Sequence, residues 1–140
     1  MAPTRYFFQT QAMSHQLSKE EKLCSRKKID TLFAEGQSFA QYPLRIVYRI
    51  YDKTTGNELP QFFISVPKRK FKRAVKRVWL RRRIREAYRL HKDIIGNTGN
   101  KCVDMAFLYI AAEQKEYHII EQQMIELLKK LSDIINKANQ

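Results

Sequence analysis

The chain has 140 residues, which is enough for one compact domain and hardly enough for two. Its hydrophobic content of 44% supplies a core and argues against wholesale disorder, and its net charge of +13 favours a polyanionic partner, either nucleic acid or an acidic membrane surface. No apolar run approaches the roughly 20 residues that span a bilayer, which argues against a membrane-spanning protein.

The two ends of the chain are expected to lie outside the folded domain. Residues 1–17 indicate a loosely ordered leader without the apolar core of a signal peptide, residues 18–137 a single α/β domain, and residues 138–140 a tail. Cys24 and Cys102 match no zinc spacing, so we expect two buried free thiols. These features together favour a protein of the reducing cytoplasm.

The first predicted elements are a helix and two strands. Ser18 and Glu21 have the spacing of a capping box, and apolar residues near helical spacing then predict a helix over residues 25–35. Alternating apolar side chains predict a strand over residues 43–51. Residues 62–66 form a second short strand, which a proline stops.

The second half of the chain begins with a basic helix over about residues 72–92. It is followed at residues 102–112 by a nearly continuous apolar run, typical of a strand that is covered on both faces. From Glu113 onward one apolar stripe predicts a last helix. The order α-β-β-(β)-α-β-α predicts an α+β fold, a single-domain α/β sandwich with a small mixed sheet of three or four strands packed against helices.

The basic segment is the most informative part of the chain. Thirteen of its 27 Lys and Arg residues fall within residues 68–92, against one acid, Glu86. At about 100° per residue, one face of the helix is apolar and is expected to pack on the sheet. The residues of this face are Leu80, Ile84, Ala87 and Tyr88. The residues expected on the opposite face are Arg81, Arg82, Arg85, Arg89 and Lys92.

Segregated guanidinium groups can grip successive phosphates through their planar donor forks, so this helix predicts a nucleic-acid interface rather than a merely solvated face. No zipper or zinc finger points to duplex DNA. Aromatic residues near the sheet could stack the unpaired bases of RNA, although each could equally be an ordinary core residue. The candidates are Phe33, Tyr42, Tyr48 and Phe62.

Several runs of the chain together resemble the signature of the bacterial ribonuclease P protein component. These runs are residues 65–70, 72–77, 81–82 and 85–87. Residues 23–33 with Gly36 are similar to that family's first helix, and Asp104 beside an apolar run is similar to its late strand. The resemblance covers about residues 19–130.

The resemblance implies a protein subunit of ribonuclease P, a ribonucleoprotein whose catalytic RNA removes the 5′ leader of precursor transfer RNA. It also implies that the basic helix contacts the catalytic RNA and that the leader binds in a cleft between the sheet and the first helix. Mg²⁺ would serve the chemistry and be held mainly by the RNA. The family fold contains a left-handed β-α-β crossover. The expected partners are catalytic RNA and precursor tRNA, with no membrane and no disulfide-linked partner.

By position, the resemblance and the charge pattern nominate two groups of site residues. The expected RNA-binding residues are Lys68, Arg69, Lys72, Arg73, Arg77, Arg81, Arg82, Arg85 and Arg89. The expected leader-binding cleft residues are Phe33, Tyr48 (allowing one inserted residue) and Phe62.

The sequence departs from the family pattern at two places. Ile29 stands where the family often has Phe, and Arg77-Val78-Trp79 stands where the family has Arg-Asn-Arg. Val78 cannot donate a hydrogen bond from its side chain. Trp79 is expected at the margin of the basic face, where its ring could stack on a base or on an arginine plane.

No catalytic residue and no protein-bound metal are expected. The carboxylates form no close cluster of the kind that a two-metal nuclease needs, and the three histidines are isolated. The chain is then an enzyme only as the subunit of an RNA-catalysed endoribonuclease, to which it contributes binding and positioning. The alternatives are a structural RNA-binding protein, such as a ribosomal protein, and a peripheral membrane protein with a free apolar helix face.

Overall fold

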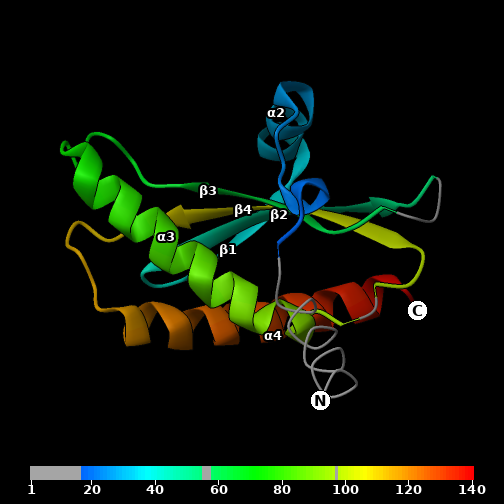
Figure 1. Ribbon diagram of the computed structural model, residues 1–140. Helices are drawn as coiled ribbons and strands as arrows, with labels where there is room; N and C mark the ends of the chain where they lie inside the picture. Colours follow the sequence, from blue (N-terminus) through cyan, green and yellow to red (C-terminus); the bar gives the residue numbers. More distant parts are fainter. Residues whose placement is uncertain (1–16, 55–57, 97) are drawn as a thin grey trace, which may run out of the picture.

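A four-stranded sheet organises the fold of the computed structural model, which describes residues 17–54, 58–96 and 98–140 (Figure 1). Its strands are β1 (Gln37–Gln41), β2 (Leu44–Asp52), β3 (Gln61–Ser65) and β4 (Lys101–Tyr109), in the spatial order β1-β2-β4-β3. β2 pairs antiparallel with both β1 and β4, whereas β3 pairs parallel with β4. The sheet is therefore mixed, as predicted.

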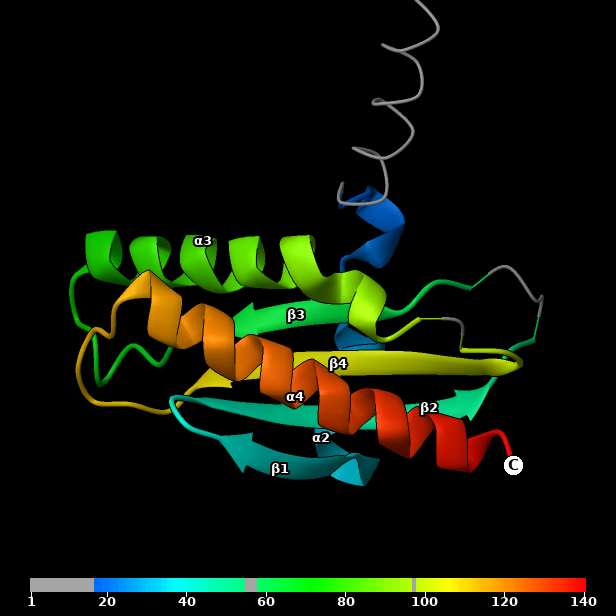
Figure 2. The same cartoon turned by 90° about the horizontal axis from the view of Figure 1, so that it is seen from below.

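Helices cover the two faces of the sheet unequally. α3 (Ala74–His91) and α4 (Tyr117–Ala138) pack on one face, and α2 (Arg26–Glu35) stands alone on the other (Figures 1 and 2). Two short 3₁₀ helices, η1 (Lys19–Glu21) and η2 (Lys92–Ile94), precede α2 and follow α3. α3 connects the parallel strands β3 and β4, and the left-handedness of this crossover stays a prediction from the family resemblance.

The predicted helix over residues 25–35 is confirmed as α2. Its N-cap is Ser25, whose side chain accepts a hydrogen bond from the Lys28 amide at 3.4 Å. At its other end Gly36 is required by close packing, because a Cβ atom there would lie 2.3 Å from the Leu32 carbonyl oxygen. The capping box of Ser18 and Glu21 is also present, and it encloses η1.

Two boundaries and one strand differ from the predictions. β1 was not placed because it is a five-residue edge strand whose side chains are mostly exposed and show no clear alternation. β4 ends at Tyr109, and α4 begins only at Tyr117, because the intervening loop is fixed by other bonds. The Tyr109 hydroxyl donates to the Glu113 carbonyl at 2.6 Å and accepts from the Lys115 amide at 2.9 Å.

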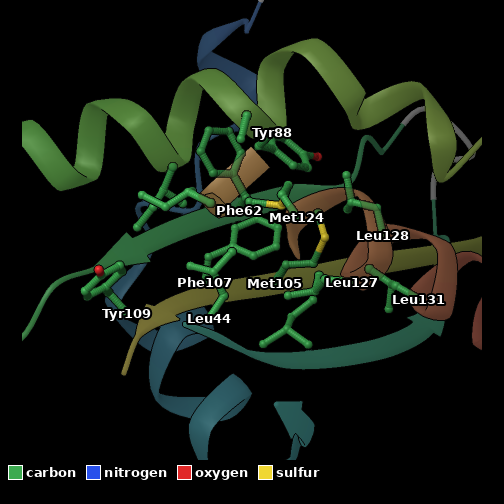
Figure 3. Close-up of a cluster of buried hydrophobic side chains, with 14 of the residues drawn as sticks. Leu44, Phe62, Tyr88, Met105, Phe107, Tyr109, Met124, Leu127, Leu128 and Leu131 are labelled. Atoms are coloured by element: carbon green, nitrogen blue, oxygen red, sulfur yellow. The ribbon is translucent and has the colours of Figure 1, made fainter. Parts of the chain in front are cut away.

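The main core lies between the sheet and the pair α3 and α4 (Figure 3). Three rings bind α3 to the sheet: the Tyr88 centroid lies 4.7 Å from that of Phe62 and 5.2 Å from that of Phe107. The apolar stripe of α4 completes this layer with the fully buried Met124, Leu127 and others. The orientation of α3 is therefore set by its aromatic contact with β3 and β4.

A second, smaller cluster lies under α2. Its buried members are Leu23, Leu32, Val47 and Ala106, with Ile29, Phe63 and Leu108 partly buried beside them. Because one ten-residue helix cannot cover four strands, much of this face of the sheet stays open.

The cysteines and the N-terminal segment give mixed outcomes. Cys102 is buried as predicted, but the prediction for Cys24 is wrong: it lies exposed just before the N-cap of α2. The predicted leader lies outside the described residues except for Leu17, which packs against the main core. Among the described residues, no helix has the length and apolarity needed to cross a bilayer.

Candidate nucleic-acid interface

α3 buries the face that the sequence predicted. Leu80, Ile84, Ala87 and Tyr88 are all at most 1% exposed, and they pack in the main core. Arg82 lies exposed on the outer side of the helix. The helix therefore packs on the sheet through its apolar face and presents cations to solvent, which is the arrangement expected of a phosphate-binding helix.

The loop between β3 and α3 is anchored at three points. Phe71 is buried, and its ring meets that of Tyr109 edge to face at 5.7 Å. Lys70 donates from Nζ to the Ile110 carbonyl at 2.6 Å. Arg77 donates from Nη1 to the Phe71 carbonyl at 2.7 Å, and to the next carbonyl along the chain at 2.8 Å. Arg77, predicted to bind RNA, thus has a structural task, because its guanidinium ties the loop to the helix.

The anchored loop holds a group of cations in place at the start of α3. We call it the N-terminal basic cluster; its members line one hollow of about 500 Å³ and are Arg69, Lys70, Lys72, Arg73 and Lys76. Lys68, next to them in sequence, is exposed as well. Glu113 lies on the opposite side of the hollow and is the one acid that lines it.

A second group of cations lies along the C-terminal half of α3. We call it the C-terminal basic cluster; together with Leu17 and Glu86 its members line a hollow of about 530 Å³ and are Arg82, Arg83, Arg85 and Arg89. Arg89 is ion-paired with Glu86, and this bond is the main cause that lowers the pKa of the Glu86 carboxyl. Arg82 and Arg85 are the exposed members of the cluster.

The prediction of one continuous row of five cations is wrong at one position, Lys92. Arg81 is half-exposed, as Arg89 is, which does not contradict its predicted place on the outer side of the helix. Lys92 lies in η2, beyond the last turn of α3, and donates from Nζ to Glu21 at 2.8 Å. The N-terminal basic cluster ends at Lys76 and the C-terminal basic cluster begins at Arg82, with the half-exposed Arg77 and Arg81 between them.

The three residues expected to line a leader cleft do not lie on one face. Phe33 on α2 is 47% exposed, whereas Tyr48 and Phe62 are 7% and 5% exposed and point into the main core on the opposite side of the sheet. This prediction is wrong because side chains alternate along a strand, so a shift of one residue changes the face. The neighbours that face α2 are Val47 and Phe63.

The open face beside α2 combines apolar and cationic groups. Phe33 meets Phe63 edge to face at 6.2 Å, and Leu108 is half-buried in the same cluster. On this side Lys28 donates from Nζ to the Gln61 side chain at 3.2 Å, which draws an α2 cation over the edge of β3. Sequence reasoning missed Phe63, although alternation around Phe62 was a signal that could have found it.

Asp104 is a buried carboxylate on β4. Its Oδ1 accepts from the Tyr51 hydroxyl at 3.2 Å, and its Oδ2 has no hydrogen-bond partner among the described residues. Burial raises the pKa of the Asp104 carboxyl, while the Tyr51 hydrogen bond and the charges of Lys28 and Arg49 act in the opposite direction. The carboxylate is therefore a cost to the folded state that neighbouring groups offset only in part.

We expect the Asp104→Asn variant to be more stable than the parent at pH 7 by roughly 1 kcal/mol, because it removes a buried charge. At a pH below the pKa of the unfolded chain, the Asp104 carboxyl is protonated in both states and costs the fold nothing. As pH rises through its raised pKa in the folded protein, the fold must bury a charge and loses stability. The advantage of the variant should therefore shrink as pH falls toward about 4, the ordinary pKa of aspartate. Urea unfolding across this range measures it, and a constant advantage would contradict the assignment.

The described residues contain no group of three or more His, Cys, Asp or Glu side chains that could hold a metal ion. The two described histidines are each paired with a glutamate: His91 with Glu121 at 2.9 Å, and His118 with Glu116 at 3.2 Å. Two basic clusters and an open aromatic face are thus what this part of the chain offers to a partner. Both features suit binding to a polyanion with unpaired bases.

Comparisons with known proteins agree with this geometry. The family model described as ribonuclease P matches residues 17–132. The chain is 35% identical over 119 residues to the ribonuclease P protein component of Porphyromonas gingivalis, an alignment that covers 83% of this chain and 86% of that protein.

Two solved structures share the fold. The ribonuclease P protein of Thermotoga maritima matches with a TM-score of 0.63 at 22% identity, over 79% of this chain and 96% of that one. The corresponding protein of Staphylococcus aureus matches with a TM-score of 0.60 at 19% identity, over 82% and 97% of the two chains.

Proposed function

The chain belongs to the ribonuclease P protein family, and we propose that it serves this RNA-dependent endoribonuclease by binding its catalytic RNA and the 5′ leader of precursor tRNA on two separate surfaces. The protein is a component of an endoribonuclease that acts with a catalytic RNA subunit, so RNA is its partner. The finer assignment, which surface binds which RNA, is the proposal.

The two basic clusters on α3 are the surface proposed for the catalytic RNA. The observation that carries this assignment is the anchoring of the backbone beneath them: the loop is anchored through Phe71, Lys70 and Arg77, and α3 is anchored through Tyr88. Preorganised cations lose little conformational entropy when they bind phosphates, so a folded RNA with a fixed pattern of phosphates suits them. The exposed residues proposed to contact it are Lys68, Arg69, Lys72, Arg73, Arg82 and Arg85.

The open face beside α2 is the surface proposed for the leader. Phe33 and Phe63 supply aromatic surface on which single-stranded bases can stack, and Arg45 on the same face is exposed. This face lies across the sheet from α3, so the protein could hold both RNA segments at once (Figure 1). Holding the leader relative to the catalytic RNA would lower the entropy cost of reaching the cleavage geometry.

Mg²⁺ is proposed to be held mainly by the RNA. The residues present do not fit a protein-held ion, because the described part of the chain brings together no trio of ligating side chains. The polypeptide would act through its charge, by reducing the repulsion between the phosphates of the two RNA molecules. We also propose a cytoplasmic location, which the partnership with transfer RNA precursors favours.

The test is cleavage of a precursor tRNA by the catalytic RNA at near-physiological Mg²⁺, with and without the polypeptide. We expect the polypeptide to raise the cleavage rate several-fold, and to strengthen binding of the precursor more than binding of mature tRNA, which lacks a leader. A structural RNA-binding protein would leave the rate unchanged. Equal effects on precursor and mature tRNA would contradict the leader surface but not the catalytic-RNA surface.

A further inference from the structure

An apolar patch interrupts the cations of α3. We call it the Trp79 patch, and its members are Ala74, Val75, Val78 and Trp79. Val75 is 79% exposed, more than any other large hydrophobic side chain among the described residues. The patch lines a hollow of about 340 Å³ whose remaining walls are Arg82 and Arg83. Val75 belongs to neither of the two hydrophobic clusters of the described residues.

The Trp79 ring is held in place from two sides. Its inner side packs against the main core, and the Arg83 guanidinium lies over the ring, 4.8 Å from its centroid. Both contacts come from the same helix or the core beneath it, so the ring is fixed before any partner arrives. With the core on one side and Arg83 over its face, the ring offers a partner its exposed edge beside Val75 and Val78, and the Arg83 guanidinium offers a plane on which a nucleobase can stack.

The positive charge around the patch and the small area of the patch favour a nucleotide over a protein as its partner. Between Lys68 and Arg85 the sequence contains no acid, and Arg82 belongs both to this hollow and to the C-terminal basic cluster. A protein partner would need an interface of roughly 800 Å² per side, far more than four side chains supply. A single base with its phosphate fits both the apolar floor and the cationic wall.

We propose that the Trp79 patch and the Arg83 guanidinium above its ring receive one unpaired base of the catalytic RNA, while Arg82 faces the phosphate beside it. The base is unpaired because only a base outside a continuous stack has a face free to pack against a side chain. The base is bound by stacking and apolar packing, because the Val78 side chain cannot form a hydrogen bond. This inference rests on the proposed function.

The first experiment measures the affinity of the full-length polypeptide for the catalytic RNA. We expect Trp79→Leu to weaken binding about 5- to 30-fold, and Trp79→Phe, which keeps a ring, to remain within about threefold. The slope of log affinity against log salt should not change, because no phosphate contact is removed. Parent-like affinity for a folded Trp79→Leu variant would overturn the proposal.

Two further variants keep the result interpretable. Val75→Ser should not affect folding, since Val75 is almost fully exposed, and it should still weaken binding about threefold. The matched control is Tyr42→Leu: Tyr42 is 55% exposed and lies beneath Lys115, 5.7 Å from its Nζ, so it presents the same aromatic and cation pair elsewhere. An equal loss of affinity in Val75→Ser and Tyr42→Leu would refute a specific site.

The second experiment identifies the occupant. A photoreactive benzophenone side chain at position 75 of the reconstituted holoenzyme should crosslink to one nucleotide that lies outside base-paired helices, and the same group at Leu59 should not. Crosslinks to a second polypeptide, or spread evenly over the RNA, would exclude a base site. If the parent chain does not bind the RNA at all, the proposed function fails as well. If the chain binds the RNA but the group at position 75 forms no crosslink, only the inference fails.

Discussion

Replacing Arg82 and Arg85 together with alanine is expected to weaken binding to the catalytic RNA by about 10- to 100-fold at physiological salt. Both side chains are exposed members of the C-terminal basic cluster, and no acid of the described residues pairs with either of them within salt-bridge distance. Each lost phosphate contact should lower the slope of log affinity against log salt by about one, so the double variant should lose about two.

The measurement is a set of binding isotherms for the reconstituted complex at several salt concentrations. The matched control is Lys129→Ala with Lys137→Ala, which removes the same charge from exposed positions on α4. Equal losses in the two double variants would mean that only net charge matters and that the cluster has no specific partner. The sequence alone would have paired Arg85 with Arg81, which is half-exposed and should contribute less than Arg82.

Tyr88→Ala should produce the largest loss of stability, about 3–5 kcal/mol in the free energy of unfolding. The ring is 1% exposed and packs against the rings of both Phe62 and Phe107, so its removal leaves a cavity between α3 and the sheet (Figure 3). Because these rings orient α3, the surviving folded protein should also bind the catalytic RNA less tightly.

Urea unfolding at neutral pH measures the change in stability. Tyr42→Ala is the control, since Tyr42 is 55% exposed and its loss should cost no more than about 0.5 kcal/mol. A cost for Tyr88→Ala as small as that of the control would show that the aromatic cluster does not hold α3 on the sheet.

The structure shows what results from the departure of this chain from its family's pattern at Val78 and Trp79. Val78 and Trp79 join Ala74 and Val75 in an apolar patch on the first two turns of a cationic helix. The predicted position of Trp79 at the margin of the basic face agrees with its half-buried state, and of the two stacking partners foreseen, the arginine plane is present as Arg83. The base is the partner that the proposed crosslinking experiment would detect.

The sequence by itself determined the elements whose signal is local. α2, α3 and α4 repeat apolar residues at helical spacing, and β2 alternates, so each could be placed within a few residues. The outward direction of Arg82 and Arg85 also follows from one helix's own period. The family resemblance rested on runs of residues that are contiguous in the chain, which no folding is needed to see.

Only the tertiary structure decided which side chains meet across long distances in sequence. Lys92 is drawn from the basic row to Glu21, 71 residues away, and Lys70 to the Ile110 carbonyl, 40 residues away. Pairing with β4 decides which alternate side chains of β2 and β3 face the core. It directs Tyr48 and Phe62 into the core, because the register is not set by either strand alone. Charge and periodicity are properties of a segment, whereas pairing and burial are properties of the assembled sheet. The type of partner could therefore be predicted from the sequence, and the individual contacts could not.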